Sequence, residues 1–143
     1  MLTESYWDGK NWLKVIEDKS STKYYLDEKV HRNNGPAVIA YLSNGGRFEN
    51  YYYHGKKYRE NGPEEILYYE DGNIMGEIYC FNELCHREDG PAIIWFKKNG
   101  SKVYYYYFNG IEFDPENLPF DLPINTKEKE FLFKLKYGEQ NDN

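Results

Sequence analysis

The chain contains only two cysteines and three histidines among its 143 residues. Cys80 and Cys85 stand close together, on what we interpret as a strand and the turn that follows it. Cysteines this few do not predict a stabilising disulfide, and they are typical of proteins in a reducing cytosol. We therefore expect a cytoplasmic protein.

Long hydrophobic runs are also missing. No stretch approaches the roughly 20 apolar residues that a membrane-spanning helix needs. The first residues, Met1–Ser5, have neither the basic start nor the apolar segment of a signal peptide. We expect a soluble protein whose partner is not a membrane.

The sequence has no residue pattern that is typical of an active site. It lacks a Ser-His-Asp arrangement, a phosphate-binding glycine loop and a cofactor fingerprint. Glu64–Glu65 and Glu70–Asp71 are adjacent carboxylates, but neighbouring strand residues point to opposite faces, and the second pair lies at a turn. We predict no enzyme, no catalytic residue and no cofactor.

Candidate metal ligands are equally scarce. Cys80, Cys85 and His86 form one loose cluster, and His54 is a distant fourth candidate. Structural zinc sites use two close pairs of ligands instead. We predict no metal site.

Basic residues are almost absent from one part of the chain. The net charge is −6, but residues 60–89 carry nine carboxylates against the single Arg87, a net charge of −8. Such a segment disfavours direct contact with nucleic acid, because nothing in it neutralises phosphates. It favours a basic protein partner, including one that itself binds nucleic acid.

Repetition is the most informative feature of the sequence. Three similar segments place their glycines 27 and 28 residues apart: His31–Pro36, Tyr58–Pro63 and His86–Pro91. A constant period of this size indicates a repeat architecture. Further turns recur in each unit, first at Asn44-Gly45, Asp71-Gly72 and Asn99-Gly100, then at His54-Gly55, Asn82-Glu83 and Asn109-Gly110. The extra residue of the longer period lies between Gly72 and Glu83.

Between the turns, the spacing of apolar residues is that of strands. The fourth and sixth residues after each Gly-Pro glycine are assigned to a buried face: Ile39, Ile66, Ile94, Tyr41, Tyr68 and Phe96. On the second strand of each unit, the residues two and four before the next turn are assigned to the same face: Leu26, Tyr53, Phe81, Phe108, Tyr24, Tyr51, Tyr79 and Tyr106. The Asn-Gly and Asp-Gly pairs predict hairpins with type I′ turns, in which both central residues have positive φ. The predicted fold class is all-β, an elongated twisted antiparallel sheet of stacked β-hairpin repeats with a short C-terminal α-helix.

The repeat domain is expected over residues 1–114. It begins with a degenerate unit, 6–28, in which Leu13 and Val15 take core positions. Three full units follow over 31–55, 58–83 and 86–110. A proline-rich connector, 115–125, then ends the sheet.

A capping helix is predicted over residues 126–137. Asn125 and Glu128 have the spacing of a capping box. The apolar stripe of this helix, Phe131, Leu132 and Leu135, is expected to cover the open edge of the sheet. Residues 138–143 are expected to form a flexible tail.

Arg32, Arg59 and Arg87 occur once in each full repeat. Arginine stems and guanidinium planes pack on aromatic rings or pair with carboxylates. Since active sites are rarely repeated three times in one chain, we assign these arginines to the scaffold.

The Tyr-rich strands and Asn/Asp-Gly turns resemble MORN-type repeats, in particular variant MORN-like units of viral and bacterial proteins. The resemblance covers about residues 6–113. The period is longer than that of a single MORN unit, and each copy carries an additional Arg-x-x-Gly-Pro turn. The resemblance implies an elongated sheet that binds proteins and sometimes lipids, without catalytic residues.

The face that alternates with the assigned core is too apolar to be fully wet. It is covered by the C-terminal segment or by a second subunit, or it is a platform for a partner. The candidate partner-binding residues are Tyr52, Leu67, Trp95 and Tyr107 on this face, and Glu65, Glu70 and Asp71 in the acidic segment.

These features predict a non-enzymatic protein-binding repeat module. The resemblance, the size and the charge suggest a more specific form: a virus- or phage-encoded inhibitor in the host cytoplasm. It would block a basic groove of a nucleic-acid-handling host protein, as an inhibitor of the anti-CRISPR or another anti-defence type. The alternative is a homo-oligomeric structural or membrane-peripheral scaffold, whose sheets pair through the apolar face.

Overall fold

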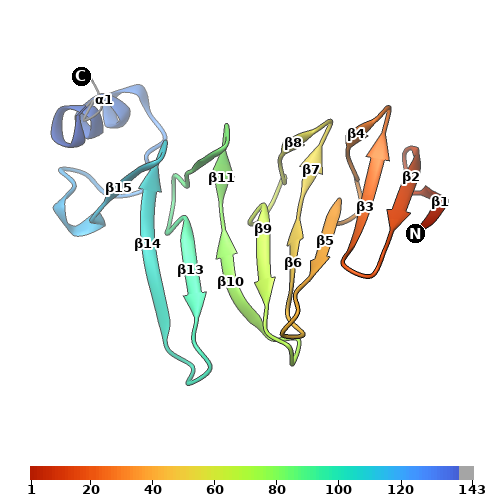
Figure 1. The fold of residues 1–143 in the computed structure, drawn as a ribbon. Coiled ribbons are helices and arrows are strands. Elements are labelled where there is room, and N and C mark those ends of the chain that lie inside the picture. The colour runs from red at the N-terminus through yellow and green to blue at the C-terminus, as the bar shows by residue number, and fades with distance from the viewer. Residues whose placement is uncertain (139–143) are drawn as a thin grey trace.

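A computed structural model, which describes residues 1–138, shows one layer of antiparallel strands that twists along its length (Figure 1). The strands are β1 (Leu2–Trp7), β2 (Trp12–Glu17), β3 (Ser21–Leu26), β4 (Lys29–Val30), β5 (Val38–Tyr41), β6 (Arg47–Asn50), β7 (Tyr52–Tyr53), β8 (Lys56–Lys57), β9 (Glu65–Tyr68), β10 (Ile74–Ile78), β11 (Cys80–Phe81), β12 (Leu84–Cys85), β13 (Ile93–Phe96), β14 (Lys102–Phe108) and β15 (Ile111–Phe113). A 3-10 turn, η1 (Pro115–Asn117), and one helix, α1 (Lys127–Tyr137), follow.

The strands follow one another across the sheet in chain order. The main sheet has 11 strands in the order β1-β2-β3-β5-β6-β9-β10-β13-β14-β15, with β4 paired to β3. The short ribbons β7–β8 and β11–β12 form separate two-stranded sheets. The predicted fold class is confirmed: the molecule is an open antiparallel sheet of sequential hairpins with one C-terminal helix.

The hairpin turns lie along two opposite rims of the sheet. We call the rim with the turns at 27–28, 54–55, 82–83 and 109–110 the tip rim, which is uppermost in Figure 1. The other rim, here the lower rim, carries the turns at 44–45, 71–72 and 99–100.

The two rims use different turns, and the prediction of type I′ turns at Asn44-Gly45, Asp71-Gly72 and Asn99-Gly100 was wrong. On the lower rim only the glycines have positive φ, +93°, +89° and +89°. Each glycine N–H bonds to the carbonyl three residues earlier, as Gly45 does to Leu42 at 3.1 Å. This is a type I turn followed by a left-handed glycine. The Asn or Asp side chain before each glycine accepts a backbone N–H two residues ahead, at 2.9 Å in all three turns.

The type I′ geometry belongs instead to the tip rim. Both central residues have positive φ in all four tip turns, for example 50° and 66° at Asn82 and Glu83. Two-residue turns of this kind match the twist of the strands that they join. Two of these turns, Asp27-Glu28 and Asn82-Glu83, contain no glycine, so the sequence did not indicate their turn type.

The extra residue of the 28-residue period is Met75. The pairing of β9 with β10 shifts between Ile74 and Gly76, which leaves Met75 as a β-bulge. Beyond the bulge, Gly76 lies between Leu67 and Trp95 on the neighbouring strands. The bulge restores the register, so the longer repeat adds to the same sheet.

The sheet has no continuous core, and the face assigned as buried is half exposed. Tyr41, Tyr53 and Phe81, which were assigned to that face, retain 49%, 45% and 54% of their accessible surface. Leu13 and Val15 are buried, as predicted for the degenerate first unit. The main buried cluster lies at the other end of the sheet and comprises Phe108, Phe113, Ile124 and Phe133.

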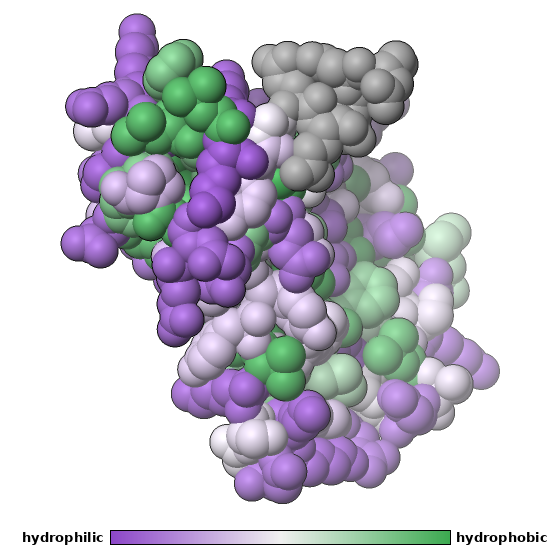
Figure 2. Space-filling model, turned by 90° about the vertical axis from the view of Figure 1, so that its left-hand side faces the viewer, coloured by the Kyte–Doolittle hydropathy of each residue, from purple (hydrophilic) through white to green (hydrophobic). Residues whose placement is uncertain are grey.

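Helix α1 packs against the last two strands through a residue that the sequence analysis missed. Phe133 is its buried residue and lies 5.1 Å, between ring centroids, from Phe108. The predicted stripe is wrong, because Phe131 and Leu135 are 60% and 67% exposed. Figure 2, which faces the end of the sheet that carries α1, shows hydrophobic atoms at the surface among hydrophilic ones.

The predicted N-cap of α1 is also wrong by one residue. Thr126, rather than Asn125, caps the helix, and its hydroxyl accepts the N–H of Lys129 at 3.1 Å. The helix ends before Gly138, which has φ +64°. Most of the predicted flexible tail, residues 139–143, lies outside the described residues.

Gly76→Ala is expected to lower the free energy of unfolding by about 2 kcal/mol, through overpacking. A Cβ at this position would lie 2.4 Å from Cζ3 of Trp95, in steric clash with its indole ring. Urea denaturation measures the change. Adding Trp95→Leu should recover part of the loss, because it removes the ring; a double variant that is less stable than the sum of the single losses would contradict this packing.

Candidate functional site

Most of the predicted partner residues lie on one face of the sheet. Residues opposite each other in the ladders point to the same side, and the register connects Phe48, Leu67, Gly76, Trp95 and Val103. We call this side the Trp95 face. Its aromatic and aliphatic members are Val38, Ala40, Phe48, Leu67, Ile78, Ile93, Trp95, Val103, Tyr105 and Tyr107.

Within the described residues, the C-terminal segment does not cover the Trp95 face. Phe108 and Phe113, on which α1 packs, lie on the opposite face, because Phe108 follows Tyr107 in β14 and Phe113 is the partner of Tyr106. Residues 1–138 supply no second layer of strands or helices over the Trp95 face. Most of its side chains remain half-buried and Tyr105 is exposed. As far as residues 1–138 are concerned, the alternatives that remain for this face are a second subunit and another partner.

Trp95 itself has a packing role within the sheet. Its ring lies over the Cα of Gly76, where no other residue type would fit without displacement. A substitution of Trp95 would therefore disturb the β10–β13 packing as well as any binding. Leu67 flanks the same glycine from the other side.

Glu65 was predicted as a free acidic contact, but the structure pairs it. Lys57 Nζ lies 3.0 Å from Glu65 Oε1, and both side chains are about one-fifth exposed. Tyr52 is the cross-strand partner of Lys57 and continues the Trp95 face toward the tip rim. Glu65 therefore contributes less free charge than the sequence suggested.

Glu70 and Asp71 lie together on the lower rim, exposed, in the β9–β10 turn. Asp71 also holds that turn, because its carboxylate accepts the backbone N–H of Asn73 at 2.9 Å. The rest of the acidic segment is divided. Glu64 is buried, and Asp89 pairs with Arg87 at 3.2 Å.

The exposed acidic residues consequently flank the Trp95 face at both ends of the strands. Glu70 and Asp71 are on the lower rim, whereas Glu60, Glu83 and Glu88 lie in turns beyond the opposite strand ends. The sequence analysis treated the nine carboxylates as one field. The fold separates that field into two rims.

The three repeated arginines have the same contacts in every unit. The guanidinium carbon of Arg59 lies 3.9 Å from the ring centroid of Tyr51, and that of Arg87 lies 3.9 Å from Tyr79. Arg32 stacks on Tyr24 at 4.2 Å. Each arginine donates from Nη1 to the proline carbonyl of its own turn, at 3.1 Å in all three copies. The predicted packing of arginine on strand aromatics is confirmed.

The glycine of each Arg-x-x-Gly-Pro turn lies against the same guanidinium group. A Cβ at Gly35, Gly62 or Gly90 would lie 2.9, 3.1 or 3.2 Å from the guanidinium carbon of the arginine in that turn. The guanidinium group is thus held close to a tyrosine ring and a glycine backbone, and the proline carbonyl takes one of its protons. This arrangement explains why the motif contains arginine and glycine three residues apart.

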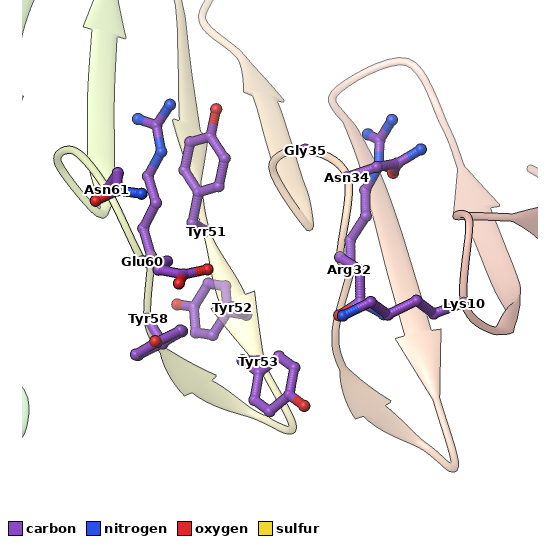
Figure 3. Close-up of a pocket in the computed structure, with 12 residues that line it drawn as sticks. Lys10, Arg32, Asn34, Gly35, Tyr51, Tyr52, Tyr53, Tyr58, Glu60 and Asn61 are labelled. Atoms are coloured by element: carbon purple, nitrogen blue, oxygen red, sulfur yellow. The ribbon is translucent and has the colours of Figure 1, made fainter.

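Sequence analysis missed a groove between the first two arginine turns. It has a volume of about 800 Å³. Figure 3 shows Tyr51, Tyr52 and Tyr53 along one strand, with Tyr58, Glu60 and Asn61 to one side and Arg32, Asn34 and Lys10 to the other. The remaining lining residues are Asn33, Gly35 and Arg59. The groove offers aromatic surfaces and several N–H donors against one carboxylate.

The four hairpin tips of the tip rim make three contacts with one another. At two of these contacts, backbone hydrogen bonds join the neighbouring tips. Gly55 N–H bonds to the Val30 carbonyl at 2.7 Å, and Gly110 N–H bonds to the Cys85 carbonyl at 2.8 Å. Histidines add a second bond, because His31 Nδ1 accepts the N–H of His54 and His86 Nδ1 accepts that of Asn109.

The middle contact, between the β7–β8 and β11–β12 ribbons, is different. Tyr58 stands in the histidine position, and the described residues provide no equivalent bond from Glu83 to Lys57. The ion pair of Lys57 Nζ in β8 with Glu65 in β9, at 3.0 Å, joins the two units instead. Glu64 accepts the N–H of Cys80 at 2.8 Å within one unit, and burial raises the pKa of the Glu64 carboxyl. We call this contact the middle seam.

Comparison of the chain with protein-family models, curated proteins and solved structures finds no match. Residues 1–138 contain no group of three or more His, Cys, Asp or Glu side chains placed to hold a metal ion. In the same part of the chain, no helix is long and apolar enough to cross a membrane.

Arg59→Ala is expected to lower the free energy of unfolding by about 1–2 kcal/mol. The variant loses the stack on Tyr51 and the bond to the Pro63 carbonyl. Thermal unfolding followed by circular dichroism measures the loss. Lys56→Ala is the control, because it removes one positive charge from an exposed position three residues earlier in the chain. Equal melting temperatures for the two variants would refute the scaffold role.

Stability is expected to fall as the pH is lowered from 7.5 to 5.5. Burial lowers the pKa of His31, with the charge of His54 acting in the same direction, and burial also lowers the pKa of His86. The unfolded chain then binds more protons than the folded chain below the ordinary histidine pKa, so acid favours unfolding. The loss is at most about 1.4 kcal/mol per pH unit for each histidine.

His31→Gln isolates this contribution. Between pH 7.5 and 5.5 the variant should lose less stability in urea denaturation than the wild type does. Glu64 acts in the opposite direction, because its raised pKa favours the folded state in acid, and the subtraction cancels that effect. The same pH dependence in both proteins would exclude His31 as its source.

Proposed function

We propose that this chain is a non-enzymatic protein-binding module of MORN-like hairpin repeats. The observation that carries the proposal is the Trp95 face, which no strand or helix of residues 1–138 covers and whose aromatic and aliphatic side chains extend across the sheet from β5 to β14. Contiguous apolar surface of this kind marks interaction sites. Tyrosine and tryptophan are also enriched among the residues that dominate binding energies.

The proposed partner is a protein with a basic groove, in particular one that handles nucleic acid. Two rims of exposed carboxylates flank the apolar strip, with Glu70 and Asp71 on one side and Glu60, Glu83 and Glu88 on the other. A basic groove has positive charge along both walls, so the two patterns are complementary. By occupying such a groove the module would act as an inhibitor, of the virus- or phage-encoded type that the MORN-like resemblance suggests.

A second candidate function uses the same face. Two copies of the sheet could pair through their Trp95 faces and form a homo-oligomeric scaffold. The half-exposed aliphatic residues on that face favour this candidate. Charged rims oppose it, because pairing like faces brings carboxylates of both copies together at low salt.

Charge reversal at the tip rim tests the proposal with a matched control. Glu83 and Glu28 occupy the same position of type I′ tip turns, with φ of 66° and 67°, and both are exposed. Glu83→Lys should slow association with a captured basic partner by about 3-fold at low salt, and by about 10-fold when combined with Glu70→Lys. Glu28→Lys, outside the acidic segment, should have a much smaller effect. Surface plasmon resonance over a salt series measures both.

The partner for this measurement is obtained by affinity capture, and nucleic acid is then added as a competitor. Competition, together with faster association at low salt, supports the proposal. Equal effects of the Glu83 and Glu28 variants, or binding that neither salt nor nucleic acid alters, would contradict it. A stable dimer in light scattering that persists at high salt would favour the scaffold instead.

A further inference from the structure

The two cysteines lie directly opposite each other in the β11–β12 ribbon. Cys80 and Cys85 are cross-strand partners, and Phe81 and Leu84 are the next pair toward the tip. Asn82 and Glu83 form the two-residue turn that joins them. Both thiols are free and half-buried. The sequence analysis placed Cys85 in a turn and therefore missed this opposition.

Backbone hydrogen bonds identify which kind of cross-strand pair this is. Phe81 and Leu84 close the two-residue turn, and the N–H of His86 bonds to the Tyr79 carbonyl at 3.0 Å. Hydrogen-bonded pairs thus lie on either side of the cysteines. The cysteine backbones point away from each other: Cys80 N–H bonds to Glu64, and the Cys85 carbonyl accepts the N–H of Gly110. Cys80 and Cys85 form a non-hydrogen-bonded pair.

Non-hydrogen-bonded pairs bring side chains closest together. Their Cα atoms are about 4.5 Å apart, whereas those of hydrogen-bonded pairs are about 5.5 Å apart. Disulfides span Cα separations of about 4.4–6.8 Å and need close Cβ atoms on the same side. The opposed cysteines meet both requirements without movement of the strands.

We propose that Cys80 and Cys85 form a reversible thiol–disulfide site, which closes within the folded hairpin when the surrounding thiol pool is oxidised. The co-reactant is a low-molecular-weight disulfide such as oxidised glutathione. One cysteine thiolate attacks a sulfur of that disulfide, forms a mixed disulfide and releases one glutathione thiolate. The second cysteine thiolate then attacks the protein sulfur of the mixed disulfide and releases the second glutathione. The two electrons and two protons lost by the protein appear in two reduced glutathione molecules.

The buried position of the two thiols makes their reaction with a disulfide slow at neutral pH. Until such a disulfide is available, both cysteines stay in the thiol form. Burial raises the pKa of both thiols, that of Cys80 to about 11. Lys57 opposes the shift at both cysteines, whereas Glu65 adds to it at both and Glu64 at Cys80. Few thiolates are present near pH 7, so the first attack limits the rate.

The test uses the folded wild-type chain with oxidised glutathione at pH 8. Mass spectrometry should show a product lighter by two hydrogen atoms and without bound glutathione, and peptide mapping should place the bond between Cys80 and Cys85. Dithiothreitol should restore the original mass. The rate should rise about tenfold from pH 7 to pH 8, because the thiolate fraction rises tenfold per pH unit below the pKa.

Moving one thiol by a single residue gives the matched control. Leu84→Cys combined with Cys85→Ser places the thiols at positions 80 and 84, which point to opposite faces. This variant should accumulate glutathione adducts and close at least tenfold more slowly. The single variant Cys85→Ser, a more conservative change, should stop at one stable adduct on Cys80.

Three results would overturn the proposal. They are stable glutathione adducts on the wild-type chain, closure of the shifted pair as fast as that of the wild type, and disulfides between chains rather than within one. Far-UV circular dichroism of each variant confirms that the reaction is measured on the folded sheet.

Discussion

The stacking of an arginine on a tyrosine ring, repeated in every full unit, is the contact on which the rest of this sheet depends. A single layer of strands has no second layer against which to bury apolar residues. Here the guanidinium group provides that layer locally, because it covers the tyrosine face and bonds to the proline carbonyl of its own turn. Five of the 16 tyrosines lie under an arginine guanidinium group: Tyr6, Tyr24, Tyr51, Tyr68 and Tyr79. A tyrosine ring packs under the cation while its hydroxyl stays in water.

Much of the fold could be predicted from the sequence, because its determinants are local and repeated. The glycine period, the strand alternation and the degenerate first unit all lie within short windows. The turn types could not be predicted in the same way. Asn44-Gly45 has the composition of a type I′ turn, but its asparagine bonds to the backbone ahead and fixes a different geometry. The packing stripe of helix α1 was assigned wrongly because Phe133 contacts residues about 20 and 25 positions earlier.

The sequence predicted which residues belong to the candidate site, but it did not predict what surrounds each of them. Alternation alone placed Leu67 and Trp95 on one face, which the ladders show. No pattern in the sequence revealed that Trp95 lies over Gly76 or that Glu65 pairs with Lys57. The groove of Figure 3 was hidden for a related reason, since its walls come from successive units and its arginines were assigned to the scaffold. Contacts between repeats depend on the register in which strands of neighbouring units pair, and the sequence of a single unit does not determine that register.

The middle seam is the junction at which neighbouring hairpin tips are joined least. In a repeat protein each unit is stabilised mainly by its immediate neighbours, so cooperativity is only as strong as the weakest junction. At this junction the described residues lack the tip hydrogen bonds of the other two, and the coupling rests on the β6–β9 ladder and the Lys57–Glu65 ion pair. Separation of neighbouring tips is therefore expected to begin at this seam, whereas the ladder below it keeps the strands of Figure 1 in one sheet.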